Sequence, residues 1–440
     1  MSKQILILGA GLVSQPLIDY LSENTDHMLT VADIALENAQ KAVESAERGH
    51  AKALDVNDES VLRSLIQDSD LVVSLLPYTL HGVVARHCLD LDKHMVNASY
   101  VSDELRALDE EAREKDLLFL CEIGLDPGID HMSAMQIIDD VKSRGGKVTE
   151  FVSVCGGLPA PDANDNPFGY KFSWSPKGVL LAGNNSARYI SEGGPREISA
   201  EDLFHSTQPM RIGSFDFEAY PNRDSISYED IYGLDGIELL MRGTLRYAGW
   251  HRYILAMKAL NLLTEEPIGS EVRSYAALLC SANGFSTADV RSEVMNKLAL
   301  SADDPAIQAL EWLGLFSEEK QDFAGKTVLD AVAEIMSGKM AFRRGERDMV
   351  ALQHQFKATF SDHKESITST LLDYGIPEGA SSMARTVSLP LAIAVKLILE
   401  DKITLRGVQI PVHSMIYEPV LAELKTCGID FEEMITRTDK

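Results

Sequence analysis

Six short apolar runs recur in the first 125 residues, and their spacing constrains the fold more than any other feature. They are Ile5–Leu8, Met28–Ala32, His50–Val56, Leu71–Leu76, His94–Ala98 and Leu117–Glu122. Their separation of roughly 20 residues is the length that a strand, a crossover helix and a parallel return strand need. Runs that are apolar almost throughout suit strands covered on both faces. The pattern therefore predicts an α/β fold with a doubly wound parallel sheet.

A glycine-rich turn follows the first run and opens a helix. Its sequence is Gly9-Ala10-Gly11-Leu12-Val13-Ser14. The first glycine permits a tight turn, and the second lets backbone N–H groups approach a pyrophosphate. Ser14 replaces a third glycine, so an ordinary turn is the alternative interpretation. Asp33, which ends the second run 22 residues after Gly11, favours a Rossmann-type dinucleotide site.

Polar or turn residues also follow the later runs. They are Asp55-Val56 after the third, Pro77-Tyr78 after the fourth, Ser99-Tyr100 after the fifth and Asp126-Pro127 after the sixth. In open parallel sheets, ligands collect outside the carboxyl ends of the strands. Each pair alone is more simply loop chemistry, and Asp126 could cap the next helix. Together they predict one edge lined for a dinucleotide.

Beyond Asp126 the apolar pattern changes to alternation, which predicts a mixed sheet with one wet face. The expected strands are Phe151–Val154, Met349–Phe356 and Ser366–Leu372, with a hairpin across Ser361–Glu365. Apolar residues at helical spacing fill most of the region between, which predicts a helical insertion. Its helices are expected at Ile254–Leu263, Tyr275–Cys280, Ala288–Leu300, Pro305–Leu315 and Val328–Met336. A further helix at Leu391–Leu399 could return to cover the first sheet.

Acidic residues outnumber basic ones in this 440-residue chain, 67 against 41, which gives a formal net charge of −26. This charge repels polyanions and anionic membrane surfaces, so neither nucleic acid nor a membrane is an expected partner. The apolar segment Leu389–Leu399 is interrupted by Pro390 and Lys396. It is also shorter than the roughly 20 residues that a bilayer span requires.

The sequence contains five cysteines: Cys88, Cys121, Cys155, Cys280 and Cys427. Because they lack metal-ligand spacing, we expect no metal and no disulfide framework, and a reduced cytoplasmic protein. No histidine stands out as a general base. His81 and His87 fall on one expected helix and His131 at the start of another, where solvated positions are the expectation.

Longer motifs identify a family. Beyond the glycine turn they are Gln15–Asp19, Leu76–Thr79, Glu122–His131, Gly156–Pro161, Gly169–Pro176, Tyr220–Ser225, Arg242–Tyr247, Glu346–Val350 and Ser381–Ala384. In this order, and over essentially the whole chain, they resemble the NADP-linked, glutamate-forming saccharopine dehydrogenases. The resemblance implies a Rossmann domain (residues 1–125 plus about 385–440), a substrate and dimerisation domain (126–250 plus about 341–384) and a helical domain (251–340), in a homodimer.

The resemblance also implies a reaction and a site. The reaction interconverts saccharopine with glutamate and 2-aminoadipate 6-semialdehyde by hydride transfer with NAD or NADP, usually in lysine biosynthesis. The implied substrate residues are Ser99, Tyr100, Asp126, Cys155, Arg223, Thr244 and Arg246. The implied cofactor residues are Gly9, Gly11, Leu12, Val13, Ser14, Asp33, Asp55, Val56, Leu76, Pro77, Ser99, Leu125, Asp126, Pro127, Trp174 and Ser175.

Individual roles follow from the chemistry of such a substrate. Saccharopine carries three carboxylates and two amino groups, so guanidinium forks at Arg223 and Arg246 suit it, although surface salt bridges are the plain alternative. Asp126 is the candidate for the substrate ammonium and for proton transfer. Cys155 is expected as a wall residue, because hydride transfer to an imine needs no covalent enzyme intermediate. A buried tryptophan is the alternative for Trp174.

The sequence departs from NADP-linked members of the family in one place. Such members usually place a basic residue just after the second strand, but Val31–Leu36 contains neither arginine nor lysine. A carboxylate at Asp33 accepts hydrogen bonds from a free ribose 2′-hydroxyl and repels a 2′-phosphate. This predicts a preference for NAD, with helix capping by Asp33 as the alternative.

Two other functions compete with this one. A carboxynorspermidine dehydrogenase-like enzyme also reduces an imine, but its substrate has fewer carboxylates, which the pair Arg223 and Arg246 disfavours. A regulator that senses dinucleotides without turnover would need no residues such as Asp126 and Thr244 beyond the nucleotide domain.

Overall fold

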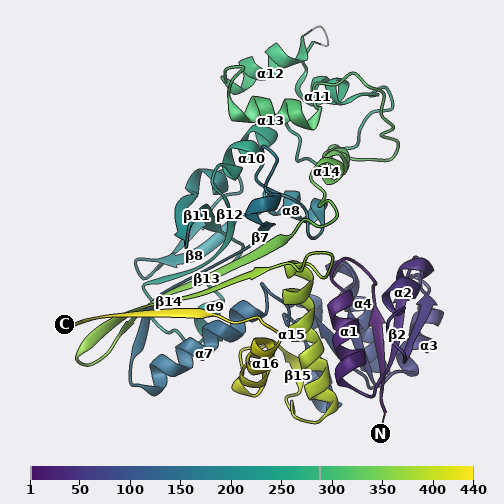
Figure 1. The fold of residues 1–440 in the computed structure, drawn as a ribbon, viewed down its shortest axis with the longest axis vertical. Coiled ribbons are helices and arrows are strands. Elements are labelled where there is room, and N and C mark those ends of the chain that lie inside the picture. Colours follow the sequence, from purple (N-terminus) through teal and green to yellow (C-terminus); the bar gives the residue numbers. More distant parts are fainter. Residues whose placement is uncertain (1, 287–288, 440) are drawn as a thin grey trace. The chain divides into compact units, whose positions relative to one another are not determined.

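The computed structural model describes residues 2–286 and 289–439 (Figure 1). The chain divides into two compact units: unit 1 contains the residues up to Val148 and from Lys357 onward, and unit 2 contains Thr149–Phe356. The three-domain boundaries expected from the sequence are finer than this division and stay a prediction.

A seven-stranded sheet forms the centre of unit 1, in the order β15-β6-β5-β4-β1-β2-β3. Its neighbouring strands are parallel. The strands are β1 (Gln4–Leu8), β2 (Met28–Asp33), β3 (Gly49–Ala53), β4 (Leu71–Ser74), β5 (His94–Asn97), β6 (Leu118–Leu120) and β15 (Gly407–Gln409). All six apolar runs thus form strands, and the predicted doubly wound sheet is confirmed.

Helices of unit 1 alternate with these strands and bury their apolar stripes. In α3, for example, Leu62 and Ile66 are buried while the Asp58 side chain caps the first turn by accepting the Val61 N–H. The helices are α1 (Gln15–Asn24), α2 (Leu36–Ala42), α3 (Glu59–Gln67), η1 (Tyr78–Leu80), α4 (His81–Asp90), α5 (Asp103–Arg106), α6 (Asp109–Glu114), α7 (Ile129–Ser143), α15 (Ser382–Leu399) and α16 (Ser414–Thr426).

The C-terminal segment returns to the first sheet. Helix α15 packs against α1 (Figure 1), and β15 pairs with β6 to form the edge of the sheet. The helix has 18 residues, so the expected helix Leu391–Leu399 was too short, and Pro390 lies inside α15 without ending it. By length and hydropathy α15 could cross a membrane, but 78% of it is buried inside the structure. It is therefore most simply a core helix.

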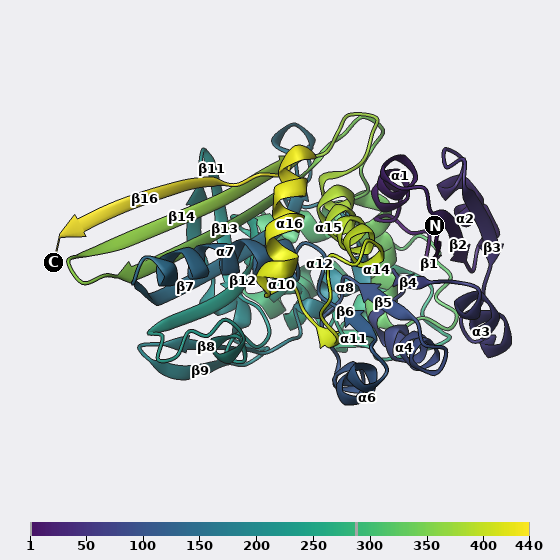
Figure 2. The same ribbon diagram turned by 90° about the horizontal axis from the view of Figure 1, so that it is seen from below.

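Unit 1 also contains a long antiparallel strand pair. Strand β14 (His363–Tyr374) pairs with β16 (Glu432–Asp439), and Figure 2 shows them running side by side. Strand β13 (Asp348–Thr359) ends just before β14, and the Phe360 N–H donates to the His363 carbonyl across the turn (2.9 Å). The turn expected at Ser361–Glu365 is confirmed.

Unit 2 contains a mixed sheet in the order β10-β11-β12-β7-β13, with β8 pairing β12 and β9. Strand β12 is parallel to β7 and antiparallel to β11, so the predicted mixed sheet is confirmed. The strands are β7 (Lys147–Pro159), β8 (Ala187–Ser191), β9 (Gly194–Ile198), β10 (Gln208–Ile212), β11 (Phe215–Pro221) and β12 (Leu239–Tyr247). Sequence analysis missed β8 to β12, because several are short and largely exposed.

The helical insertion lies within unit 2. Its helices are α10 (Trp250–Ala259), α11 (Tyr275–Asn283), α12 (Val290–Leu298), α13 (Pro305–Leu313) and α14 (Val328–Lys339). These confirm the predicted insertion, although the expected start at Ala288 lies outside the described residues. Shorter helices of unit 2 are η2 (Pro161–Ala163), α8 (Pro176–Ala182), η3 (Leu203–Ser206) and α9 (Tyr228–Ile231).

Candidate dinucleotide and substrate sites

The carboxyl ends of the parallel strands share one edge of the sheet in unit 1. The predicted residues at this edge are Gly9 to Ser14 after β1, Asp33 at the end of β2, Asp55 and Val56 after β3, Leu76 and Pro77 after β4, Ser99 and Tyr100 after β5, and Leu125, Asp126 and Pro127 after β6. The fold thus collects these residues where open parallel sheets bind ligands.

The turn after β1 depends on Gly9. Its φ is +101°, which L side chains rarely adopt, and its N–H donates to the Ala32 carbonyl (2.8 Å). A Cβ atom at Gly9 would lie 2.9 Å from the Leu75 carbonyl oxygen, so a larger residue would displace the backbone. At Gly11, in contrast, a Cβ atom would meet nothing within 4 Å. The space at Gly11 is open to a ligand.

The N-terminus of α1 presents backbone donors next to this space. Ser14 makes no side-chain capping bond, and the first turn of α1 contains no acidic residue. Within the described part of the chain, the N–H groups of Gly11, Leu12 and Val13 have no protein acceptor. Free amides and the positive end of the helix dipole favour a phosphate group. These residues therefore fit a dinucleotide pyrophosphate.

Apolar side chains at the same edge are unusually exposed. Leu12, Ile34 and Tyr78 are 73%, 77% and 75% exposed, more than any other large apolar side chain in residues 2–286 and 289–439. They follow β1, β2 and β4, which are neighbours in the sheet. Exposed apolar side chains that gather at one edge mark a binding surface. An adenine or nicotinamide ring is a partner of suitable chemistry.

Both carboxylate oxygens of Asp33 accept backbone N–H groups. Its Oδ2 accepts the Ala10 N–H (2.8 Å), and its Oδ1 accepts the Ala35 N–H (2.9 Å). The bond to Ala10 ties the end of β2 to the glycine turn, and the bond to Ala35 caps the segment before α2. Asp33 thus has a structural role that explains a carboxylate at this position without reference to a ribose hydroxyl.

The loops after β5 and β6 bring Tyr100 and Asp126 into contact. The Tyr100 hydroxyl donates to Asp126 Oδ1 (3.2 Å), and the Asp126 side chain is half-buried. Helix α7 begins at Ile129 with Gly128 as its N-cap, so Asp126 is not the N-cap residue. The expectation that Asp126 could cap this helix is therefore wrong.

Two histidines that were expected in solvent are buried, so those expectations were wrong. His81 is 2% exposed and contacts the hydroxyls of Ser74 (2.8 Å) and Ser99 (2.9 Å) through its two ring nitrogens. Burial lowers the pKa of His81 to about 4, so its ring is neutral near pH 7. His131 is 0% exposed, and its Nε2 lies 2.9 Å from Glu122 Oε2. His87, on the same helix as His81, is half-buried.

In unit 2, three predicted substrate residues share one face of the mixed sheet. Cys155 in β7 lies opposite Thr244 in β12, and Tyr220 in β11 lies opposite Thr244 on the other side. Arg246 stands two positions after Thr244, so its side chain leaves the same face of the strand. The fold therefore brings Cys155, Thr244 and Arg246 together within this unit.

The Arg246 guanidinium is buried without a carboxylate partner. Arg246 is 5% exposed, and its Nη1 donates to the Leu245 carbonyl (2.8 Å) while its Nε has no acceptor. Its guanidinium carbon lies 5.0 Å from the centre of the Tyr170 ring and 5.7 Å from that of Trp250. Among the described residues, Arg246 forms no ion pair. A buried cation with no counter-charge is costly and favours an anionic ligand.

Glu218 is the acidic residue opposite Arg246 in the strand register, but it is engaged elsewhere. Its carboxylate accepts the N–H groups of Gly249 (2.9 Å) and His251 (2.7 Å) and contacts His251 Nδ1 (2.7 Å). These bonds satisfy the start of α10. They explain why this carboxylate does not neutralise Arg246.

The remaining predicted residues of unit 2 are Arg223, Trp174 and Ser175, which do not belong to strands β7 or β12. Arg223 is exposed in the loop after β11, with φ +54°, and its carbonyl accepts the Arg188 N–H (2.8 Å). The Ser175 hydroxyl accepts the Gly178 N–H (3.2 Å) as the N-cap of α8, and Trp174 is half-buried. Cofactor roles for Trp174 and Ser175 stay predictions.

Family models match both parts of the chain. The model described as Saccharopine dehydrogenase NADP binding domain matches residues 5–120, and the model described as Saccharopine dehydrogenase C-terminal domain matches residues 124–429. The second match alone spans more than half of the 440 residues. The chain belongs to the saccharopine dehydrogenase family. The resemblance inferred from the motifs is confirmed.

Similar proteins match over almost the full length. Proteins named saccharopine dehydrogenase (NADP(+), L-glutamate-forming) are 38% identical over 448 residues in Pyricularia oryzae, covering 99% of each chain, and 41% identical over 435 residues in Saccharomyces cerevisiae, covering 97% of each. The solved apo structure of a saccharopine dehydrogenase (L-Glu forming) from Saccharomyces cerevisiae has a TM-score of 0.89 at 38% identity, covering 99% of this chain and 100% of that one. This likeness confirms the fold class.

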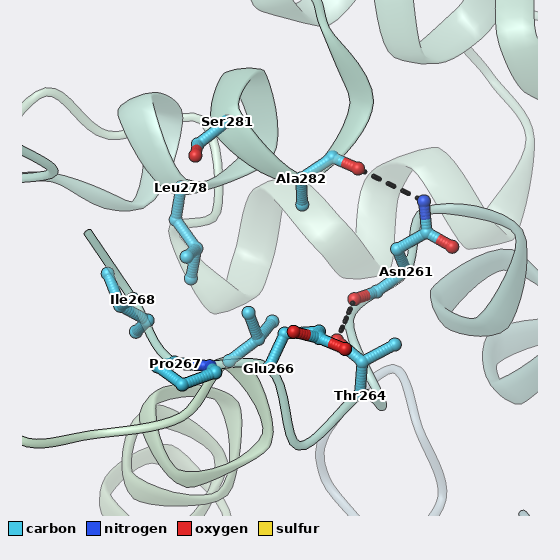
Figure 3. Close-up of a pocket in the computed structure, with 9 residues that line it drawn as sticks. Asn261, Thr264, Glu266, Pro267, Ile268, Leu278, Ser281 and Ala282 are labelled. Atoms are coloured by element: carbon cyan, nitrogen blue, oxygen red, sulfur yellow. Dashed lines mark hydrogen bonds between the residues drawn. The ribbon is translucent and has the colours of Figure 1, made fainter.

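A cleft of about 380 Å³ in the helical insertion contains none of the residues expected in the saccharopine dehydrogenase site. It is lined by Asn261, Thr264, Glu266, Pro267, Ile268, Leu278, Ser281, Ala282 and Val328. Figure 3 shows the Asn261 side chain donating to the Ala282 carbonyl (3.0 Å). The residues 2–286 and 289–439 contain no group of three or more His, Cys, Asp or Glu placed to hold a metal.

The polar supports of the family's site in unit 1 were missed by sequence reasoning. Asn97 is fully buried and accepts the Ser99 N–H (2.9 Å), while Glu122 accepts the Val101 N–H (3.0 Å) and contacts His131. A buried polar residue at the end of an apolar strand was a signal that could have found Asn97. Helix periodicity offered no comparable signal for His81, because the residue is the first of its helix.

Proposed function

We propose that this chain interconverts saccharopine with glutamate and 2-aminoadipate 6-semialdehyde, with NADP(H) as the redox partner. The observation that carries the proposal is the buried Arg246 guanidinium without a carboxylate partner, because a substrate with three carboxylates supplies the missing charge. The names of the full-length relatives support the same reaction. The open glycine turn at Gly11 supports a dinucleotide.

When bound, the dinucleotide supplies or accepts the hydride. The residues of unit 1 would bind its pyrophosphate through the amides of Gly11, Leu12 and Val13. The residues of unit 2 would bind substrate carboxylates through Arg246 and Arg223. Cys155 and Thr244 would form part of the wall beside Arg246, since they share its strand face. No step needs a nucleophile from the protein.

Asp126 is the proposed proton-transfer group. Joining an amine to an aldehyde requires removal of a proton from the ammonium and release of water from the carbinolamine, and a carboxylate can accept and return that proton. The Tyr100 hydroxyl donates to Asp126 Oδ1 and fixes the direction of the carboxylate. We expect the Asp126 carboxylate to contact the substrate ammonium as well.

The choice between NAD and NADP rests on two opposing observations. The relatives are named for NADP(+), and the matching nucleotide family model is an NADP binding domain. A carboxylate at Asp33 favoured NAD in the sequence analysis. However, both oxygens of Asp33 already accept backbone N–H groups, so this structural role explains why a carboxylate stands there. We therefore propose NADP(H), and the NAD preference expected from the sequence finds no support.

The decisive experiment measures NADPH oxidation with glutamate plus 2-aminoadipate 6-semialdehyde, beside the precursors of carboxynorspermidine. Turnover of the first pair alone is the expected result. Turnover of the second would assign the chain to the neighbouring imine reductases. Tight NADPH binding, followed by fluorescence, without turnover of either pair would favour a dinucleotide sensor and overturn the proposal.

We further propose a cytoplasmic homodimer. Strand β16 lies at a sheet edge with all eight residues exposed, and it presents Met434 and Ile435 at 66% and 47% exposure. An open edge with apolar side chains can pair with a second chain. The five free cysteines suit a reducing compartment. Light scattering should give twice the chain mass of 48.4 kDa, and a monomer would contradict the proposal.

A further inference from the structure

A buried chain of hydrogen bonds joins β4, α4 and the loop after β5 in unit 1. Ser74 ends β4 and is 1% exposed, and its Oγ lies 2.8 Å from Nδ1 of His81. The opposite ring nitrogen, Nε2, lies 2.9 Å from Oγ of Ser99. Ser99, at the carboxyl edge of the sheet, is an expected ligand residue, but the proposed mechanism gives no task to His81 or Ser74.

Every polar group of Ser99 is held by the protein. Its N–H donates to Asn97 Oδ1 (2.9 Å), its carbonyl accepts the Glu122 N–H (3.1 Å), and its hydroxyl contacts His81. A loop residue fixed at three points has a single side-chain position. Such fixing is what a ligand contact made by a small hydroxyl needs.

The surroundings of Ser74 select one tautomer of His81. The Ser74 hydroxyl has no acceptor other than His81 Nδ1 in the described part of the chain. If Nδ1 carried the proton, Ser74 would accept it and its own buried O–H would be left unpaired. An unpaired buried donor costs more than an unused lone pair. Ser74 therefore donates to a bare Nδ1, and the ring proton lies on Nε2.

This tautomer sets the direction of the Ser99 hydroxyl. With its proton on Nε2, the His81 ring donates to Ser99 Oγ, so the Ser99 proton is free to point away from the ring. We propose that His81 is a positioning residue that turns Ser99 into a hydrogen-bond donor toward an oxygen of the bound ligand. The acceptor is a carbonyl or carboxylate oxygen, either on the nicotinamide carboxamide or on the substrate; only this assignment of the ligand rests on the proposed function.

A double-mutant cycle separates positioning from plain structural support. The proteins are wild type, His81→Asn, Ser99→Ala and the double variant, because asparagine keeps a partner for Ser74 but does not reach Ser99. We expect each single variant to weaken binding about three- to tenfold, the range of one ordinary hydrogen bond. The double variant should be no weaker than Ser99→Ala. If His81→Asn weakened ligand binding by the same factor in the wild-type protein and in Ser99→Ala, His81 would only support the fold.

Two readouts identify the source of the acceptor. The dissociation constant of NADPH, measured by fluorescence, changes if the acceptor is on the dinucleotide, whereas the KM for saccharopine changes if it is on the substrate. His81→Gln, whose side-chain amide can reach Ser99, should recover most of the loss. His87→Asn on the same helix is the matched control and should change neither value. A wild-type level of both values in Ser99→Ala would overturn the proposal.

A ligand-free measurement keeps the inference independent of turnover. Nitrogen-15 NMR of the eleven histidines, with His81 assigned by its absence in His81→Asn, should show a protonated Nε2 and a bare Nδ1. A proton on Nδ1 would overturn the proposal even if saccharopine turnover is found. If wild type turns over no saccharopine while this tautomer is present, the proposed function fails and the inference about His81 stands.

Discussion

The two candidate regions are built from different materials. At the sheet edge of unit 1, the groups that face a ligand are mainly backbone amides and glycine positions, such as Gly11 and the start of α1. On the strand face of unit 2, they are side chains, and the charge comes from Arg246. A site formed by backbone amides loses affinity for its ligand when the backbone conformation changes. A site that depends on one buried cation loses affinity when that cation is removed. Substitutions in the two units should therefore have different signatures.

The largest effect is expected from Arg246→Met, which keeps the length of the side chain but removes its charge. Losing one partner of a buried charged pair costs about 2–5 kcal/mol. The kcat/KM for saccharopine should therefore fall by a factor of about 30 to several thousand. The dissociation constant of NADPH should stay nearly unchanged, because the proposed pyrophosphate contacts, Gly11 to Val13, lie in unit 1. Steady-state kinetics and a fluorescence titration measure the two values.

An exposed arginine of the same unit is the control for Arg246. Arg196 pairs with Glu192 at 2.8 Å, and its side chain is 55% exposed. Because exposed pairs contribute only about 0–1 kcal/mol, Arg196→Met should leave kinetics and melting temperature near wild type. If Arg246→Met kept wild-type KM and kcat, the buried guanidinium would not bind substrate, and the proposed carboxylate site would be wrong.

The second effect compares two glycines of the same turn. Gly9→Ala places a Cβ atom against the Leu75 carbonyl at a positive φ, so it should lower the free energy of unfolding by about 1–3 kcal/mol. Gly11→Val fills space that the fold leaves open, so it should weaken NADPH binding at least about tenfold, or 1.4 kcal/mol, with little change in stability. Urea unfolding and a fluorescence titration separate the two. Equal stability losses would show that the space at Gly11 belongs to the fold.

The difference between the units also explains how far the sequence could be interpreted. The sheet of unit 1 was predictable because its strands are continuous apolar runs and its turn is marked by glycines, both of which are local features. The contact of His81 with Ser99 was not, because it joins residues that only the packing of β4, α4 and β5 brings together. Helix periodicity placed His81 in solvent, since the pattern assigns burial from apolar residues alone.

In unit 2 the mixed sheet and the helical insertion were predicted, but several individual strands were not. Cys155, Thr244 and Arg246 were named from the family resemblance, and the strand register does bring them onto one face. Strands such as β9 and β10 escaped detection because their residues are largely exposed, so no alternation of apolar and polar positions marks them. The rings of Tyr170 and Trp250 contact the Arg246 guanidinium. These contacts join separate segments of the chain, so no local sequence pattern could predict them.

The third effect concerns Asp126, whose side chain lies at the carboxyl edge of the sheet in unit 1, where most other proposed ligand groups are backbone amides. Asp126→Ala should lower the kcat/KM for saccharopine at least about tenfold, or 1.4 kcal/mol of transition-state stabilisation. Tyr100→Phe, which removes the hydrogen bond to Asp126, should have a smaller effect on the same value. Because Gly128 is the N-cap of α7, no N-cap residue is lost, and the melting temperature of Asp126→Ala separates a loss of stability from a loss of catalysis. Wild-type kinetics across pH for Asp126→Ala would remove it from proton transfer.

The smallest effect on kinetics is expected at Asp33, whose carboxylate lies beside the backbone amides of the glycine turn. Wild type should prefer NADPH to NADH, and the proximity of the Asp33 carboxylate should limit that preference. In water, two unit charges about 7 Å apart repel by about 0.6 kcal/mol, close to threefold. Asp33→Asn should therefore raise the ratio of kcat/KM for NADPH over NADH about threefold, while the oxygen of the asparagine amide still accepts one backbone N–H.

Asp33→Ala removes both backbone hydrogen bonds of Asp33 and should also lower the free energy of unfolding by about 1 kcal/mol. An unchanged ratio in Asp33→Asn would leave Asp33 as a cap alone, and a strong wild-type preference for NADH would restore the interpretation of Asp33 as a ribose ligand.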